Sequence, residues 1–155
     1  MFLNKVYFWF GPFLLGFLYI GFSETVSSRS KESNYLDLEV AQNKADLQKS
    51  ISRGKDVYTD FCMQCHLATG KGDLVNFPPL DGSEWLIKKR KQSIHAIKYG
   101  QTGEIMVKGK KFNNIMPPLG LSDQEVADVM NFIMNSWSNK QKKMVTLGEV
   151  KAVVN

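Results

Sequence analysis

The chain has 155 residues, of which 43% are hydrophobic and 12% aromatic. This composition fits one globular domain of modest size and excludes a disordered, a collagen-like or a polytopic membrane protein. Its 20 basic and 15 acidic residues give a formal net charge of +5. That excess is too small to indicate nucleic-acid binding, and no aromatic residues alternate with the basic ones as stacking on bases requires.

The first 23 residues have the pattern of an export signal. Val6–Phe22 is an uncharged run of 17 residues that follows a lysine and precedes a polar stretch. Gly21 and Ser23 place small side chains where a signal peptidase requires them. Because such a run also just suffices to cross a bilayer, residues 1–23 are either a cleaved signal peptide or an N-terminal membrane anchor. In both cases we expect the remainder to be periplasmic, soluble or anchored to the outer side of the inner membrane.

The next residues, 24–44, are polar and predict a linker, and a first helix is expected over 45–61. Gly54 lies on the apolar face of this expected helix. Because glycine in a helix interior costs stability, its presence there indicates close approach of another backbone. The side chains expected on the same face are Ile51, Tyr58, Phe61 and Cys62.

The two cysteines of the chain follow this helix directly, as Cys62-Met63-Gln64-Cys65-His66. A cysteine pair in an exported protein would ordinarily indicate a disulfide. The spacing C-x-x-C-H is instead the signature of c-type haem attachment. In that arrangement both thiols add to the haem vinyl groups, and the adjacent imidazole binds the iron. The motif therefore predicts one covalently attached haem c, held by Cys62, Cys65 and His66.

Two other uses of this cysteine pair are disfavoured. A redox-active dithiol of the thioredoxin type needs a strand before the motif and a surrounding βαβ pattern, and neither is found. A zinc site needs two further ligands, and the only other histidine is His95. His95 falls on an expected helix, where we interpret it as a surface or pocket-edge residue.

A helix is expected from Lys88 to Tyr99, where Gly100 gives a stop signal. It begins within one of three basic clusters. These clusters are either solvated faces or a docking surface for an acidic partner, because charge complementarity accelerates encounter. The clusters cover residues 88–91, 108–111 and 140–143.

A haem iron has a second axial position, and among the seven methionines Met116 is the best candidate to fill it. Met116 lies in an Asn-rich loop and is followed by two prolines that stiffen the backbone. Such a loop presents the weakly binding thioether at low conformational cost. Met106 lies in a strand-like, β-branched stretch and is expected to pack or to line the haem pocket. Met130 and Met134 are expected to fill the core.

The last long helix begins at a capping box, Ser122-Asp123-Gln124-Glu125. Its apolar stripe is expected to comprise Val126, Val129, Met130, Ile133 and Trp137. A final short helix is expected after Thr146, ending at Val153.

From Ser50 to Trp137 the chain resembles the class I monohaem c-type cytochromes. The residues that match the N-terminal helix and haem motif of that family are Gly54, Tyr58, Cys62, Cys65 and His66. The resemblance implies a small all-α cytochrome c fold, here assigned to residues 45–155. It also implies that Gly54 meets Phe132 where the N-terminal and C-terminal helices cross, with Tyr58 alongside.

The segment after the haem motif matches the family through Pro78, Leu80 and Gly82. The resemblance implies that the Pro78 carbonyl accepts a hydrogen bond from Nδ1 of the ligand histidine, with Pro79 as the adjacent candidate. The stretches 78–85 and 116–137 are similar to cytochrome modules that accompany periplasmic dehydrogenases and reductases. Trp85 would then either donate a hydrogen bond to a haem propionate or pack on the haem ring.

These observations predict an exported electron carrier, not an enzyme, with one haem c and His66 and Met116 as axial ligands. Its expected partners are redox proteins such as a dehydrogenase, a reductase or an oxidase. One alternative is a haem-binding subunit held permanently in a dehydrogenase or oxidase complex. Another is a haem enzyme or gas sensor with a labile or absent sixth ligand.

Overall fold

The computed structural model describes the backbone of residues 24–155 and the side chains from Tyr35 onward. The predicted signal peptide or anchor at residues 1–23 lies outside the described residues. The described part of the chain divides into two units, with the boundary between Ala41 and Gln42. Within the described part, no helix is both long and apolar enough to span a membrane.

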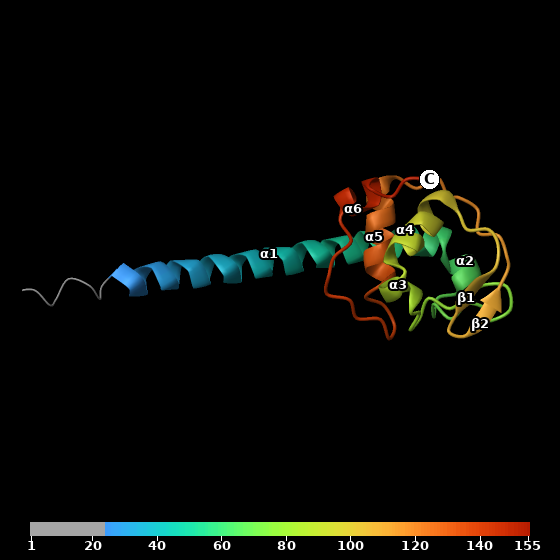
Figure 1. Cartoon of the computed structure of the whole chain (residues 1–155), viewed down its shortest axis with the longest axis horizontal. Coiled ribbons are helices and arrows are strands. Elements are labelled where there is room, and N and C mark those ends of the chain that lie inside the picture. The colour runs from blue at the N-terminus through green and yellow to red at the C-terminus, as the bar shows by residue number, and fades with distance from the viewer. Residues whose placement is uncertain (1–23) are drawn as a thin grey trace, which may run out of the picture. The chain divides into compact units, whose positions relative to one another are not determined.

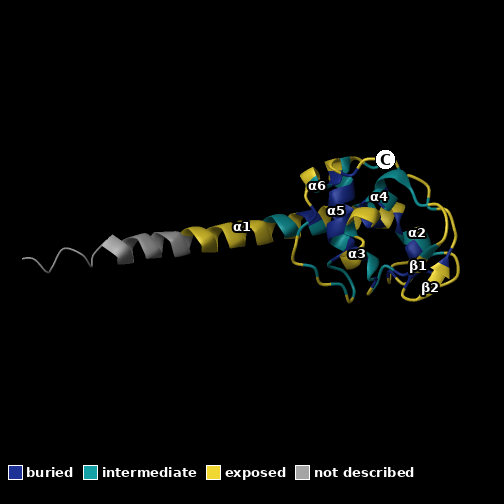
Figure 2. Cartoon of the chain, in the orientation of Figure 1, coloured by how far each residue is buried: buried dark blue, intermediate teal, exposed yellow. Residues whose placement is uncertain are grey.

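The first helix, α1, runs from Glu24 to Phe61, so the prediction that it begins at residue 45 is wrong. The polar residues 24–44 are helical. This stretch contains neither glycine nor proline and is rich in good helix formers such as Leu, Glu, Gln and Lys. Residues 35–45 are all exposed (Figure 2), so intrinsic propensity and not burial accounts for their helicity. A linker role for this segment stays a prediction.

Helices are the dominant regular structure of the second unit and strands are few, which confirms the expected all-α class (Figure 1). A two-stranded antiparallel hairpin is the only sheet among the described residues, and it pairs Ile105 with Phe112 and Val107 with Lys110. The elements after α1 are α2 (Met63–His66), α3 (Trp85–Lys88), α4 (Arg90–Tyr99), β1 (Ile105–Val107), β2 (Lys110–Phe112), α5 (Asp123–Ile133) and α6 (Leu147–Lys151).

The helix expected over 88–99 is divided at Lys89, whose φ of −128° and ψ of 41° leave the helical region. Its predicted end is confirmed, because α4 stops at Tyr99 and Gly100 adopts a φ of 88°. That conformation belongs to the left-handed side of φ/ψ space, where glycine carries no penalty.

The predicted helix crossing is present within the second unit. A Cβ atom on Gly54 would lie 1.9 Å from the carbonyl oxygen of Asp128 in α5 and 2.9 Å from Cβ of Phe132. The Tyr58 ring lies 5.2 Å from the Phe132 ring. Phe61, expected on the same apolar face, is instead 45% exposed. The crossing therefore depends on Gly54, Tyr58 and Phe132.

Helix α5 begins at the expected capping box, in which the Ser122 hydroxyl accepts the N–H of Glu125 and the Glu125 carboxylate accepts the N–H of Ser122. Its expected apolar stripe is buried as far as Ile133. Trp137 lies beyond the helix end with a φ of 55°, and its indole N–H donates to the Ala68 carbonyl at 2.9 Å.

Residues after 137 complete the core. Thr146 caps α6, as expected, but the helix ends at Lys151, before the expected end at Val153. Arg90, expected on an exposed basic face that is either solvated or a docking surface, instead has a side chain that is only 17% exposed and pairs with Glu149 at 2.6 Å. The buried side chains that this segment contributes are Val145, Val150 and Val153.

Replacing Gly54 by alanine should destabilise the protein, because the new methyl group meets backbone atoms that cannot move without separating the two helices. We expect a loss of roughly 1–3 kcal/mol in unfolding free energy, as for other overpacked sites. Gly148→Ala is the matched control, because a Cβ there would lie 3.9 Å from its nearest neighbour, Oγ1 of Thr146. Helix propensity should make this control neutral or slightly stabilising. Urea denaturation measures both, and equal stabilities would contradict the close crossing.

Candidate functional site

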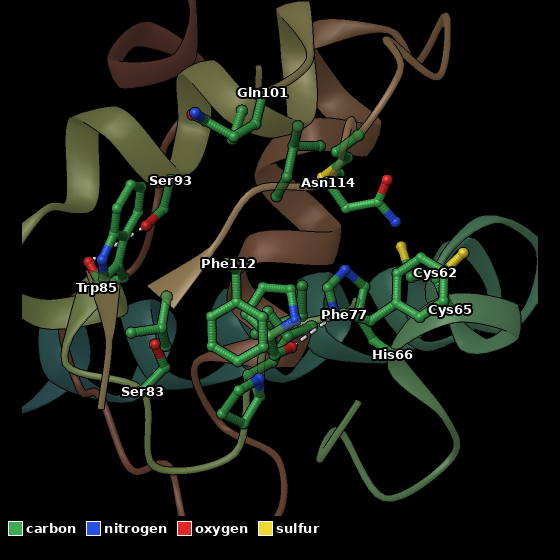
Figure 3. A pocket seen from close by; sticks show the side chains of 18 of the residues that line it. Cys62, Cys65, His66, Phe77, Ser83, Trp85, Ser93, Gln101, Phe112 and Asn114 are labelled. Atoms are coloured by element: carbon green, nitrogen blue, oxygen red, sulfur yellow. Dashed lines mark hydrogen bonds between the residues drawn. The ribbon is translucent and has the colours of Figure 1, made fainter. Parts of the chain in front are cut away.

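A cavity of about 320 Å³ lies in the second unit, within the range of roughly 300–1,000 Å³ that is usual for small-molecule and cofactor sites. Its walls come from α2, α3, α4, α5, the hairpin and the loops around residues 76–80 and 114–119, and Figure 3 shows part of the lining. Most lining side chains are apolar, among them Phe77, Leu86, Ile97, Val107, Phe112 and Ile133.

One wall is the cysteine motif. The N–H groups of Cys65 and His66 both donate to the Cys62 carbonyl, at 3.2 and 2.9 Å, so the motif forms a helical turn directly after α1. Cys62, Cys65 and His66 all line the cavity (Figure 3), and the two cysteines do not form a disulfide with each other. Burial raises the pKa of the Cys62 thiol to about 12, so before a haem is attached this thiol is protonated at neutral pH. It therefore differs from the activated thiolate of a dithiol oxidoreductase.

His66 is held by the hydrogen bond that the resemblance implied. Its Nδ1 lies 3.0 Å from the Pro78 carbonyl oxygen. Because a carbonyl only accepts, Nδ1 carries the proton and Nε2 keeps its lone pair. Burial lowers the pKa of His66, against the opposing effect of the Pro78 bond, so the ring is neutral at pH 7. The carbonyl in question belongs to Pro78 and not to Pro79.

The loop after the motif fixes the Pro78 carbonyl. Leu80 and Asp81 both donate backbone N–H groups to the Gly70 carbonyl, at 2.7 and 2.9 Å. Gly72 donates to the His66 carbonyl at 3.1 Å and adopts a φ of 60°. A Cβ on Gly72 would lie 2.1 Å from the Phe77 carbonyl oxygen. Glycine is therefore required for the chain to return to His66.

Met116 lines the same cavity from the loop that follows the hairpin. Its backbone forms an isolated bridge with Gln101: the Gln101 N–H donates to the Met116 carbonyl at 2.8 Å, and the Met116 N–H donates to the Gln101 carbonyl at 2.9 Å. The structure thus brings Met116 and the cysteine motif, at least 50 residues apart in sequence, to one cavity.

Met106 does not behave as expected. It lies on β1, which agrees with its strand-like sequence, but it is 43% exposed and does not line the cavity. Its neighbours Ile105 and Val107 do line it, since alternate side chains of a strand face opposite sides. Met130 and Met134 are buried core residues, as predicted.

Trp85 also lines the cavity. Its indole N–H donates to the Met106 carbonyl at 2.7 Å, and the Lys89 ammonium lies 4.5 Å from the ring centroid. The ring nitrogen is thus already paired within the protein. His95 lies on α4, half-buried, with its ring 5.1 Å from that of Tyr99, and it does not line the cavity.

Sequence reasoning missed two polar residues that hold the site. Gln101 pairs with Met116 across 15 positions, and nothing in the local sequence marks such a bridge. Asn131 is fully buried on α5 and binds both the N–H and the carbonyl of Val145, at 2.7 and 2.9 Å. An asparagine in the apolar stripe of a helix is the signal that could have indicated it.

The alternatives for the cysteine motif find no support in the fold. In the described region, no three His, Cys, Asp or Glu side chains gather to hold a metal ion. The described strands both follow the motif, whereas a thioredoxin-like dithiol requires a strand before it. The apolar cavity with two thiols and one neutral imidazole in its wall matches the chemistry of a haem attached through thioethers and bound by a histidine.

Residues 51–137 match the model of the cytochrome c family. The chain belongs to the cytochrome c family. It is 38% identical over 107 residues to cytochrome c-552 of Thermus thermophilus, an alignment that covers 63% of this chain and 81% of that protein.

Two cytochrome c subunits of dehydrogenases are also similar. One belongs to the quinone-dependent alcohol dehydrogenase of Gluconacetobacter polyoxogenes, with 34% identity over 101 residues, 63% of this chain and 21% of the relative. The other belongs to the gluconate 2-dehydrogenase of Pantoea cypripedii, with 35% identity over 107 residues, 64% of this chain and 23% of the relative. The similarity to these two subunits therefore spans less than a quarter of their length.

Family membership confirms the function expected from the cysteine motif. The protein carries a covalently attached haem c and transfers electrons through its iron, and Cys62, Cys65 and His66 fit the attachment motif. A protein of this function exchanges electrons with redox partner proteins. The haem supplies an iron that alternates between the ferric and ferrous states when bound.

Gly72→Ala should disturb the hydrogen bond that orients His66. The added Cβ meets the carbonyls of Phe77 and Pro78, so the loop must move and the bond to Nδ1 weakens. That bond makes the imidazole a stronger donor and favours ferric iron, so its loss should raise the reduction potential. Gly109→Ala is the control, because Gly109 has a φ of 74° but open space around it. Potentiometry that gives equal shifts for both variants would contradict this role.

Proposed function

We propose that this cytochrome is a His/Met-ligated electron carrier in which His66 and Met116 bind the haem iron from opposite sides. The observation that carries the proposal is that both side chains line one cavity, each fixed through backbone hydrogen bonds of its own segment. Met106, the competing methionine, lies on the exposed side of β1.

The proposed ligands are well suited to electron transfer. His66 is neutral with Nδ1–H engaged, which leaves Nε2 as the donor atom. The Met116 thioether is also neutral, and neutral ligands favour the ferrous state, which raises the reduction potential. The apolar walls exclude water, and the fixed loops limit movement of the ligands between the two oxidation states.

Trp85 is proposed to pack against the haem ring, because its N–H already donates to the Met106 carbonyl. A propionate bond would require that contact to break. Pro78 acts through His66, as the acceptor that holds the imidazole in one tautomer and orientation.

The protein is proposed to be exported, with residues 1–23 as a signal peptide or as an anchor on the outer side of the inner membrane. Its partners would be a dehydrogenase, a reductase or an oxidase, and the exposed lysines of the cluster at 88–91 are candidates for docking. The likeness to dehydrogenase subunits supports the alternative of a bound subunit. Detergent-dependent copurification with a larger complex would favour that alternative.

Met116→Ala should remove the sixth ligand while the haem stays attached through Cys62 and Cys65. The near-infrared spectrum of the oxidised wild-type protein should show the weak sulfur-to-iron charge-transfer band, and the variant should lack it. Axial ligands set haem potentials over roughly 0.8 V, so we expect the potential to fall on the order of 100 mV. Met106→Ala is the matched control and should leave both the band and the potential unchanged.

Two results would contradict the proposed ligation. A charge-transfer band that persists in Met116→Ala would assign the ligand to another methionine. Absence of the band from the wild-type protein, together with rapid carbon monoxide binding by its reduced form at neutral pH, would favour a haem enzyme or gas sensor with an open sixth position.

A further inference from the structure

The C-terminal segment at residues 144–153 lies outside the part of the chain that matches the cytochrome c family and forms hydrogen bonds to both ends of α4. We propose that this segment positions Met116, an inference that rests on the proposed His66 and Met116 ligation. The connection has three links: the segment holds both ends of α4, α4 continues directly into Gln101, and Gln101 pairs with Met116.

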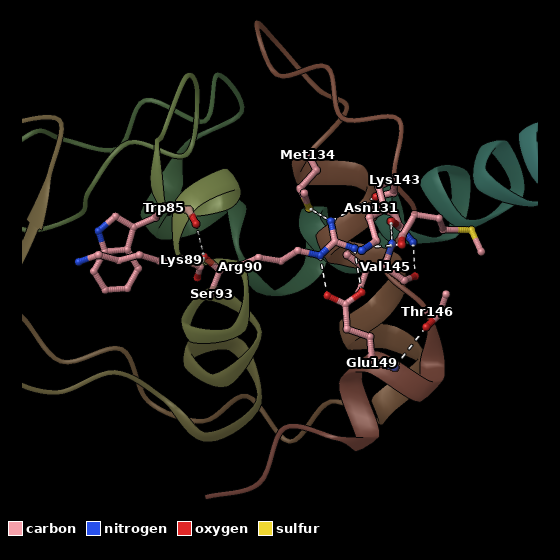
Figure 4. A network of polar contacts seen from close by, with 11 residues as sticks. Trp85, Lys89, Arg90, Ser93, Asn131, Met134, Lys143, Val145, Thr146 and Glu149 are labelled. Carbon is pink, nitrogen blue, oxygen red and sulfur yellow. Dashed lines mark hydrogen bonds and ion pairs between the residues drawn. The ribbon is translucent and has the colours of Figure 1, made fainter.

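The first end of α4 is held by Arg90, as Figure 4 shows. Its guanidinium forms a two-pronged ion pair with Glu149, with Nε to Oε1 at 2.6 Å and Nη2 to Oε2 at 2.8 Å. The same group donates to the carbonyls of Met144 and Lys143, at 2.9 and 3.2 Å. These bonds fix the start of α4 to the C-terminal segment, because the several N–H donors of one planar guanidinium define both the distance and the orientation of the contact.

The other end of α4 is held by two residues of its last turn. The Lys98 ammonium donates to the carbonyls of Val150 and Val153, both at 3.3 Å, and pairs with Asp123 at 2.8 Å. The Tyr99 hydroxyl donates to the same Val153 carbonyl at 3.2 Å. Val150 and Val153 are themselves buried, so the accepting carbonyls sit on an anchored backbone.

The last residue of α4, Tyr99, lies two positions before Gln101, which bonds to Met116. A Cβ on Gly100 would lie 2.7 Å from the Met116 carbonyl oxygen, which shows how closely the two backbones approach. Gln101 then forms both hydrogen bonds of the bridge to Met116, at 2.8 and 2.9 Å. Movement of Tyr99 would therefore move Gln101, and with it the backbone that carries the thioether.

The loop that carries Met116 has little other support. Among the described residues, the pair with Gln101 is the only backbone-to-backbone hydrogen bonding that joins positions 113–121 to a distant part of the chain. Most side chains of this loop are exposed or half-buried. Because a thioether binds iron weakly, a small displacement of this backbone suffices to weaken the sixth bond.

The test uses the full haem-loaded protein and two truncations. A chain that ends at Ala152 lacks Val153 and thus the carbonyl that accepts from Lys98 and Tyr99. A chain that ends at Val153 loses only two exposed residues and is the matched control. In the reduced protein, carbon monoxide must displace the methionine. We expect its binding to be at least about tenfold faster in the shorter chain, as for loss of one neutral hydrogen bond and one from a charged donor, and unchanged in the control.

The variant Glu149→Gln distinguishes an effect on the position of Met116 from a general loss of protein stability. It weakens the hold at the first turn of α4, next to Arg90, but leaves the Lys98 and Tyr99 bonds to Val153, which hold the turn next to Gln101, in place. On heating the oxidised protein, the charge-transfer band should disappear together with the helical circular dichroism in this variant. In the chain that ends at Ala152, the band should disappear at a clearly lower temperature than the helices. Coincident losses in both proteins would overturn the proposal.

Tyr99→Phe keeps the chain complete and removes one hydrogen bond, so it tests the same link if the shorter chain fails to fold. We expect carbon monoxide binding to be about threefold faster than in the wild-type protein, which is the effect of a single weak hydrogen bond. Binding at the wild-type rate would refute the proposal. If instead the charge-transfer band is absent from the wild type or survives in Met116→Ala, the ligation fails first and this inference with it.

Discussion

The backbones of α1 and α5 touch at Gly54, and the arrangement of the cavity depends on this contact. A side chain at this position would meet the Asp128 carbonyl at 1.9 Å, so only glycine permits the helices to approach so closely. Polar bonds reinforce the crossing, because the buried Asp128 carboxylate accepts from the Ser50 hydroxyl at 2.6 Å and from the Arg53 guanidinium at 2.7 Å. Helix α1 then delivers the cysteine motif, while Met130 and Ile133 of α5 line the cavity.

The two sides of the cavity are built by different means. On the His66 side, the attachment cysteines and the imidazole share one helical turn, and the Pro78 carbonyl is returned to that turn by a short glycine-containing loop. On the Met116 side, a loop depends on one bridge to Gln101. Local geometry thus fixes the first side, whereas packing of distant segments fixes the second. Changes elsewhere in the chain should therefore affect the Met116 side of the cavity more than the His66 side.

This difference explains what the sequence could predict. The cysteine motif, the capping box at Ser122 and the role of Gly54 each depend on a few neighbouring residues, and the fold agrees with all three. The start of α1 was missed because polarity was interpreted as absence of structure, although helix propensity was high. The burial of Arg90 depends on Glu149, 59 positions away, and no local pattern reports such a partner. The exposure of Met106 depends on which face of β1 meets the cavity, and the packing of distant segments decides that.

The segment after Trp137 belongs to the redox unit physically, although the family match ends there. The Asn131 side chain shows why: it donates to the Ser50 hydroxyl of α1 and the Val145 carbonyl, and it accepts the Val145 N–H. One buried amide on α5 thus joins the first helix to the C-terminal segment, and leaving any of these polar groups unpaired would cost free energy. The same segment is bonded to both ends of α4. The helix that precedes Gln101 is therefore fixed by a C-terminal segment that Asn131 links to α1, which keeps the Met116 loop in place although the loop's own bonding is sparse.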